Sequence, residues 1–357
     1  MEGEVCNFTM VWTVVLACLL YSYTIGKFIP QGTTRLFSLT IVTCLFLWLP
    51  LNLTTIHLGG LTSFFIAWLA NFKLLLFAYG KGPLSSHPPL PLSRFIAIAC
   101  LPIKIMPTHS HSESTSIQET VKIKLLKKTF LAKLILFGML LKVYDFNEYI
   151  HPKTRMSLYC VHIYLMLEVV LAVVAYVART MVQMELEPQF DEPYLATSLQ
   201  DFWGKRWNLM VTSILRPTIY NPVHSISSRV VPRKQASLVA VFTTFLVSGI
   251  MHEFIFYNIG GLKPTGEVTC FFLLHGVLVS IEVCIKRVVK GKLHLPAILA
   301  RPLTLGCVFA TSFWLFFPPF LRFEPDVRGC RETVAFLEFV TTGRLISPSN
   351  TSCPYSL

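Results

Sequence analysis

His252 and Glu253 are adjacent ionisable residues inside an apolar run that extends over residues 237–259. This run is long enough to span a lipid bilayer. A charged side chain near the bilayer centre costs about 2.5–3.5 kcal/mol on insertion scales, so a sequence that keeps such residues usually uses them. A buried neutral histidine is a good general base, and in an apolar cavity its natural proton donor is a hydroxyl or amine of a lipid-like molecule. The alternative is that both residues only form hydrogen bonds with neighbouring helices.

Helical geometry separates the directions of these two side chains. His252 shares a helix face with Ser248, four residues earlier, whereas Glu253 points about 100° away. We therefore expect His252 to face a reaction cavity, with Ser248 orienting the imidazole, and Glu253 to contact a supporting partner. Phe256 occupies the second histidine position of an HExxH pattern, which excludes a zinc protease on this helix.

A second segment whose residues could take part in chemistry is Asp-Phe-Trp-Gly-Lys-Arg-Trp-Asn, residues 201–208. It lies about forty residues before the histidine. Trp203 and Trp207 are four residues apart, so a helix here would carry an aromatic stripe suited to the membrane interface, with Asp201 and Lys205 on another face. By itself, the segment is typical of an interfacial amphipathic helix. Three basic residues have the charge to pair with phosphate groups: Lys205, Arg206 and Arg216.

The elements that must position these residues are membrane helices. The chain has 357 residues, of which 53% are hydrophobic and 14% charged, whereas soluble domains average about 25% charged residues. We predict an all-α polytopic membrane protein with about eight transmembrane helices, within a range of seven to nine. The apolar runs lie near residues 11–28, 36–53, 61–79, 130–145, 157–178, 237–259, 267–285 and 303–321. A ninth run, 95–103, is too short to span and is expected to be re-entrant or interfacial.

The distribution of Lys and Arg predicts the orientation. Basic residues gather in segments 80–129, 179–236 and 286–302, which are therefore expected on the cytoplasmic side, with both termini lumenal. We expect one membrane-embedded domain over residues 1–357, with a flexible basic cytoplasmic loop at 104–128 and a lumenal tail at 322–357. The sequons at Asn7, Asn52 and Asn350 all fall on the predicted lumenal side. Cys330 and Cys353 would also be lumenal and could pair.

Composition also excludes some classes of protein. The net charge is +12, but the basic residues are scattered over short loops, so nucleic-acid binding is not expected. The cysteines form no CxxC pair, and no metal site is predicted. A proton-coupled transporter would also use intramembrane His and Glu, but it predicts repeated halves, and the sequence has no internal repeat. A lipid-binding scaffold that does not need His252 for its activity is a further alternative.

The two motifs together resemble the membrane-bound O-acyltransferases, whose signature is an aromatic-rich motif ending in Asn followed by an intramembrane His. DFWGKRWN at 201–208 and SGIMHEFIF at 248–256 are similar to the plant wax synthase branch, as are the segments 57–60 and 68–83. This branch includes long-chain-alcohol O-fatty-acyltransferases and a similar acyl-CoA:sterol acyltransferase. The motif lacks the FYxDWWN form of the diacylglycerol and cholesterol acyltransferase relatives.

The resemblance implies that a long-chain fatty acyl group passes from acyl-CoA to a long-chain alcohol, forming a wax ester, or alternatively to a sterol. It implies an endoplasmic reticulum membrane location, membrane lipid as surroundings and no cofactor, because acyl-CoA is a substrate. It leaves the oligomeric state open. His252 would be the general base, and Asn208 would orient the thioester or donate to the developing oxyanion. The expected supporting residues are Glu253, Ser248, Asp201, Trp203 and Trp207, and the expected coenzyme A phosphate contacts are Lys205, Arg206 and Arg216.

Overall fold

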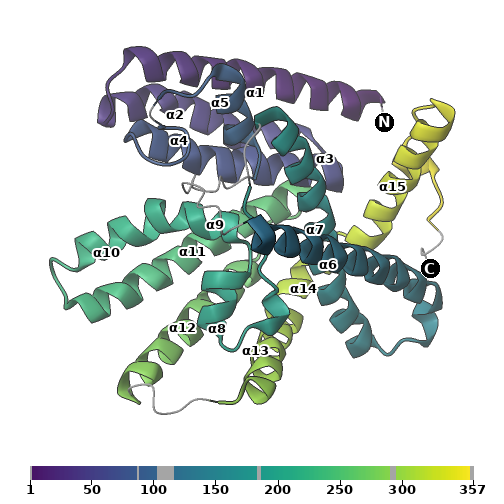
Figure 1. The fold of residues 1–357 in the computed structure, drawn as a ribbon. Coiled ribbons are helices and arrows are strands. Elements are labelled where there is room, and N and C mark those ends of the chain that lie inside the picture. The colour runs from purple at the N-terminus through teal and green to yellow at the C-terminus, as the bar shows by residue number, and fades with distance from the viewer. Residues whose placement is uncertain (1, 87, 103–115, 183–185, 290–294, 354–357) are drawn as a thin grey trace.

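The computed structural model describes residues 2–86, 88–102, 116–182, 186–289 and 295–353. Within these ranges all regular structure is helical and no strand is formed, which confirms the predicted all-α class. Figure 1 shows α1, α2 and α4 side by side at the top, α10 and α11 extending to one side, and α15 on the other. The fold is therefore an assembly of helices in which the N-terminal ones pack alongside one another.

Seven segments of the described residues are long and apolar enough to cross a membrane. They comprise α1 (Glu2–Phe28), α2 (Thr33–Trp48), α3 (Ile56–Thr62) continuing into α4 (Asn71–Ala78), α7 (Pro152–Val182), α11 (Arg233–Gly260), α12 (Glu267–Val288), and α13 (Ala297–Thr311) continuing into α14 (Phe317–Leu321). This number lies within the predicted range of seven to nine.

The eighth predicted span lies within α6 (Ser116–Val143), whose apolar part is interrupted by lysines. Lys133 Nζ lies 2.6 Å from the Glu168 carboxylate on α7, and Lys142 pairs with Asp145. The ion pair with Glu168 compensates part of the cost of burying Lys133. That α6 crosses the bilayer stays a prediction.

The loop predicted at 104–128 is wrong for its second half, because residues 116–128 form the start of α6. Their sequence contains neither Gly nor Pro and is rich in Ile, Leu, Lys, Gln and Glu, most of which are good helix formers. The first half of that loop, up to residue 115, lies outside the described residues. The run at 95–103, predicted to be re-entrant or interfacial, forms most of the short helix α5 (Leu92–Cys100), which has a buried face.

Lys73 on α4 holds the end of α5 in place. Its side chain is fully buried, and its ammonium group donates to the carbonyl oxygens of Ile98 and Leu101, both at 2.6 Å, and to that of Ala99 at 3.5 Å. The last carbonyls of a helix have no partner within the helix and carry partial negative charge. The buried lysine therefore satisfies the end of a short helix that is itself buried.

The C-terminal segment contains a helix, α15 (Pro325–Thr342), that contacts the start of α3. The carboxylate of Glu332 accepts hydrogen bonds from the amides of Ile56 at 2.7 Å and His57 at 3.0 Å. The predicted pairing of Cys330 with Cys353 is confirmed as a disulfide. Figure 1 places α15 on the same side of the molecule as the N-terminus of α1.

Close backbone approach joins α11 to α12. A Cβ atom on Gly249 would lie 2.9 Å from Thr269 Cα, and one on Gly276 would lie 3.1 Å from Phe245 Cβ. Small residues of this kind let membrane helices pack with their backbones close together. The residues of α11 between these two contacts and beyond them, including His252, are therefore held at a fixed distance from α12.

Candidate active site

The orientation of His252 is set by the backbone of its own helix. The Nδ1 atom lies 2.7 Å from the carbonyl oxygen of Ser248. A carbonyl oxygen can only accept a hydrogen bond, so Nδ1 carries a proton, and the neutral form of the ring then has its lone pair on Nε2. Ser248 contributes this contact through its backbone and not through its hydroxyl. When the imidazole is neutral, its accepting nitrogen is therefore Nε2.

Aromatic rings from three elements surround His252. Phe272 of α12 stacks on the imidazole at a centroid distance of 4.3 Å, and Trp68, from the segment between α3 and α4, meets it edge-on at 5.0 Å. Phe316, from the segment between α13 and α14, lies at 6.4 Å. These rings cover part of the half-buried imidazole and limit the access of water to it, which strengthens electrostatic interactions there.

Glu253 points away from His252 and contacts the first turn of α12. One carboxylate oxygen accepts hydrogen bonds from the amides of Val268 at 3.0 Å and Thr269 at 3.1 Å. The first amides of a helix have no partner within the helix, and its N-terminus carries partial positive charge. Glu253 thus satisfies two donors at the end of α12 and holds this helix against α11.

The aromatic segment differs from the helix that its spacing predicted. After α8 (Leu199–Asp201), residues Phe202–Arg206 form a π-helical turn, and Trp207 is extended, with φ −90° and ψ 125°. The ring of Phe202 stacks on Trp207 at 5.4 Å, whereas Trp203 packs against α12. The two tryptophans therefore do not form the helical stripe that the spacing predicted; both are partly buried against other rings of the protein.

Asn208 adopts a left-handed backbone conformation, with φ 42°, and caps α9 (Leu209–Leu215). Asn tolerates this conformation better than most residues. Its Oδ1 atom accepts from the amide of Val211 at 3.2 Å, which leaves the side-chain NH₂ as a donor.

The helix that follows Asn208 packs against the His252 helix and Trp68. One buried apolar cluster joins these three parts: Trp68, Leu69, Met210, Val211, Ile214, Leu215, Met251 and Ile255. Four of these residues lie on α9, and two lie on α11 beside His252. The structure thus brings the Asn208 cap and the histidine helix together.

The three basic residues expected to contact the phosphates of coenzyme A have different surroundings. Arg206 is held by the Asp201 carboxylate at 2.8 Å and by the carbonyl oxygen of Asp191 at 3.1 Å. Spacing placed Asp201 on one face with Lys205, but its partner is Arg206. Lys205 and Arg216 are exposed. The charge of Arg206 is therefore compensated within the protein, and the better candidates for a phosphate are Lys205 and Arg216.

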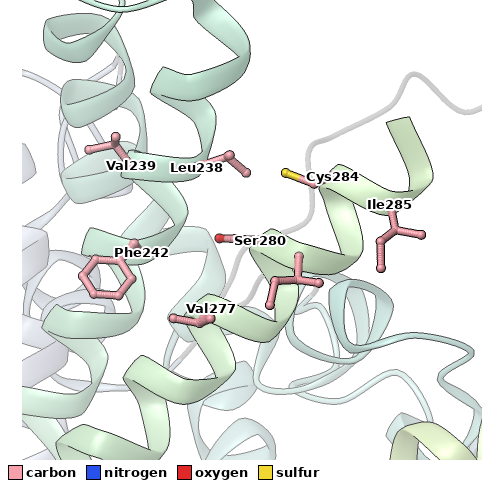
Figure 2. A pocket seen from close by; sticks show the side chains of 8 residues that line it. Leu238, Val239, Phe242, Val277, Ser280, Cys284 and Ile285 are labelled. Carbon is pink, nitrogen blue, oxygen red and sulfur yellow. The ribbon is translucent and has the colours of Figure 1, made fainter. Parts of the chain in front are cut away.

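An apolar groove lies between α11 and α12, several turns of α11 away from His252. Figure 2 shows Leu238, Val239 and Phe242 of α11 opposite Val277, Ser280 and Cys284 of α12. The groove has a volume of about 490 Å³ and is separated from His252 by the contact between Phe245 and Gly276. No cluster of His, Cys, Asp or Glu side chains in the described part of the chain is arranged to hold a metal ion.

Some residues around the site could not be found from the sequence. Trp68 lies far from His252 along the chain, and no pattern relates the two positions. Phe272 lies in an apolar run that reads as an ordinary membrane helix. Gln189 was also missed: its side-chain NH₂ donates to the carbonyl of Pro102, and its backbone carbonyl accepts from the amide of Leu209 at 2.8 Å. Gln189 therefore ties the start of α9 to the segment that follows α5.

Comparison with known proteins identifies similar sequences. Residues 186–274 match the model of the membrane bound O-acyl transferase family, and this stretch contains both the aromatic segment and His252. The chain is 45% identical over 323 residues to acyl-CoA–sterol O-acyltransferase 1 of Arabidopsis thaliana, covering 88% of this chain and 91% of that protein. It is 42% identical over 335 residues to the long-chain-alcohol O-fatty-acyltransferase of Simmondsia chinensis, covering 93% and 94%. A probable long-chain-alcohol O-fatty-acyltransferase 3 of Arabidopsis thaliana is 43% identical over 344 residues, covering 95% and 97%.

Proposed function

The chain belongs to the membrane-bound O-acyl transferase family, and on that premise we propose that it transfers a long-chain acyl group from acyl-CoA to a long-chain alcohol, forming a wax ester. The observation that carries this proposal is the arrangement of His252. Its Nδ1 donates to the carbonyl of Ser248, so that Nε2 is the accepting atom, within walls formed by aromatic rings. Such a base suits a hydroxyl nucleophile in an apolar site.

The reaction proceeds without an acyl-enzyme. Nε2 of His252 takes the hydroxyl proton while the alcohol oxygen attacks the thioester carbonyl carbon. The carbon–sulfur bond then breaks, and the coenzyme A thiolate takes the proton back from the imidazolium. The NH₂ group of Asn208, whose Oδ1 is occupied by Val211, donates to the oxyanion or orients the thioester.

Exclusion of water explains why this chemistry suits a membrane. Water would compete with the alcohol and hydrolyse the thioester, and the rings of Trp68, Phe272 and Phe316 limit its access to His252. The exposed Lys205 and Arg216 offer charge for the coenzyme A phosphates on the predicted cytoplasmic side. We place the protein in the endoplasmic reticulum membrane, where acyl-CoA arrives from the cytosol.

A sterol acceptor is the second candidate. The specific observation in its favour is the 45% identity to a protein named as a sterol acyltransferase. Both acceptors present a hydroxyl to the same base, so the chemistry at His252 does not separate them.

The test is ester synthesis in cells that lack endogenous esterification. Labelled acyl-CoA is supplied with either a fatty alcohol or a sterol, and the wild type is compared with His252→Ala. Wax ester formed by the wild type and lost in the variant supports the proposal. If the wild type forms sterol ester only, the long-chain alcohol is not its acceptor, although the reaction is still acyl transfer to a hydroxyl. If it forms no ester from either acceptor, the proposed function is wrong.

A further inference from the structure

His275 is a fully buried histidine on α12, one helical turn after Phe272, and both of its ring nitrogens have partners. The indole Nε1 of Trp203 lies 3.0 Å from Nδ1 of His275. The hydroxyl of Thr311 on α13 lies 2.9 Å from Nε2. One side chain therefore connects the aromatic segment, α12 and α13.

The direction of these hydrogen bonds follows from the donor groups. An indole N–H can only donate, so Nδ1 of His275 accepts, and the ring proton is on Nε2. Nε2–H then donates to Thr311, whose hydroxyl donates to the carbonyl of Cys307 at 2.8 Å. The chain of hydrogen bonds runs one way, from Trp203 to α13, and fits a neutral imidazole.

Trp203 connects this buried histidine to both residues of the proposed reaction. Its ring contacts Phe272 at a centroid distance of 5.8 Å, and Phe272 stacks on His252 at 4.3 Å. Its carbonyl oxygen accepts from the hydroxyl of Thr212 on α9, at 3.4 Å. Asn208 caps the same helix. The position of the indole thus affects the ring against His252 and the helix that begins at Asn208.

We propose that His275 is a positioning residue for acyl transfer, which holds Trp203 so that Phe272 stays against His252 and α9, the helix that Asn208 caps, stays packed against α11. The inference rests on the proposed function and gives His275 no contact with the reacting atoms. A misplacement of about 1 Å in a reactive site costs about 10²-fold in rate. Loss of the hydrogen bond between His275 and Trp203 is therefore expected to lower kcat. The KM for acyl-CoA is expected to change little, because the proposed contacts of its phosphates, Lys205 and Arg216, do not include His275.

The test measures kcat and KM of purified wild type and variants for ester formation. His275→Leu is expected to lower kcat by up to about 10²-fold. His275→Gln is expected to recover part of that loss, because its amide offers one acceptor and one donor. Thr311→Val and Thr311→Ser are a matched pair: valine has the shape of threonine without the hydroxyl, so only the valine variant is expected to lose activity.

A double variant tests whether the effect passes through the indole. His275→Leu leaves the Trp203 N–H without a partner, and adding Trp203→Phe removes that N–H. The double variant is expected to have a kcat no lower than that of His275→Leu alone, whereas a multiplicative further loss would overturn the proposal.

Other results also decide against the proposal. It is overturned if His275→Leu has the kcat of the wild type, or if its loss appears only as a raised KM. If His275→Leu does not fold, the matched pair decides, and equal kcat for Thr311→Val and Thr311→Ser overturns the proposal. Failure of the function itself is distinguished by the wild type, which would then make no ester.

Discussion

The imidazole of His252 lies nearly parallel to the ring of Phe272, with centroids 4.3 Å apart and an interplanar angle of 28°. The two residues come from different helices, α11 and α12. The stack therefore supports the ring orientation that the Ser248 carbonyl sets, and it does so only while the two helices keep their spacing, which the close contact at Gly249 maintains.

Replacement of Phe272 by leucine is expected to reduce kcat by about 2–10-fold, because an aromatic pair contributes about 0.5–1.5 kcal/mol beyond the area it buries. Phe272→Tyr keeps the ring and serves as the control. The measurement is the steady-state rate of ester formation. An unchanged rate for the leucine variant would show that the stack does not orient the base.

The contact of Glu253 with the first turn of α12 predicts a role in stability. Glu253→Ala removes the acceptor for two amides and is expected to destabilise the protein by about 0.5–2 kcal/mol, the range for a lost helix cap. Glu253→Gln keeps a carbonyl oxygen and is expected to retain activity. Thermal unfolding in detergent and the ester-forming rate are the two measurements. An inactive but well-folded glutamine variant would assign Glu253 a part in proton transfer instead.

The buried ammonium of Lys73 predicts a second effect on stability. Lys73→Met keeps the length of the side chain and leaves the terminal carbonyls of α5 without their donor. Each unsatisfied buried group costs about 1–3 kcal/mol. The expected result is a lower unfolding temperature and faster proteolysis around residue 101. Wild-type stability would mean that these carbonyls find other partners.

The pair formed by Asp201 and Arg206 predicts a dependence of stability on pH. Burial raises the pKa of the Asp201 carboxyl, but hydrogen bonds from Arg206 and the Thr197 amide outweigh burial and hold it below its ordinary value. A carboxyl with a lowered folded-state pKa stabilises the protein above its unfolded pKa of about 4, and this stabilisation is lost as pH falls through the folded value. Asp201→Asn is therefore expected to be less stable than the wild type at neutral pH, with the difference shrinking below about pH 4. A difference that is constant over pH in thermal unfolding would contradict this account.

The sequence predicted the fold class, most of the spans and the disulfide between Cys330 and Cys353. These features follow from long apolar runs and from the sides on which basic residues fall, both of which are properties of local sequence. The helical start of α6 was missed because its many polar residues read as a loop. The aromatic segment departs from a regular helix where Trp203 packs against Phe245 of α11 and Phe272 of α12, and such tertiary contacts are not encoded in the spacing of the tryptophans.

At the candidate site, local periodicity separated the directions of His252 and Glu253. It did not predict that His252 contacts the backbone carbonyl of Ser248 and not its hydroxyl, because four residues of helical spacing bring either oxygen within reach of the imidazole. The walls formed by Trp68 and Phe272 depend on packing between distant segments, which spacing along the chain does not encode.

The central claim is that His252 is the general base of acyl transfer. The most direct measurement is the rate of ester formation by purified His252→Ala, compared with the wild type at saturating acyl-CoA and alcohol. Loss of a general base lowers the rate by about 10²–10⁴-fold, and we expect a loss in this range with the unfolding temperature little changed. Ester formation by a folded His252→Ala protein at the wild-type rate would contradict the account.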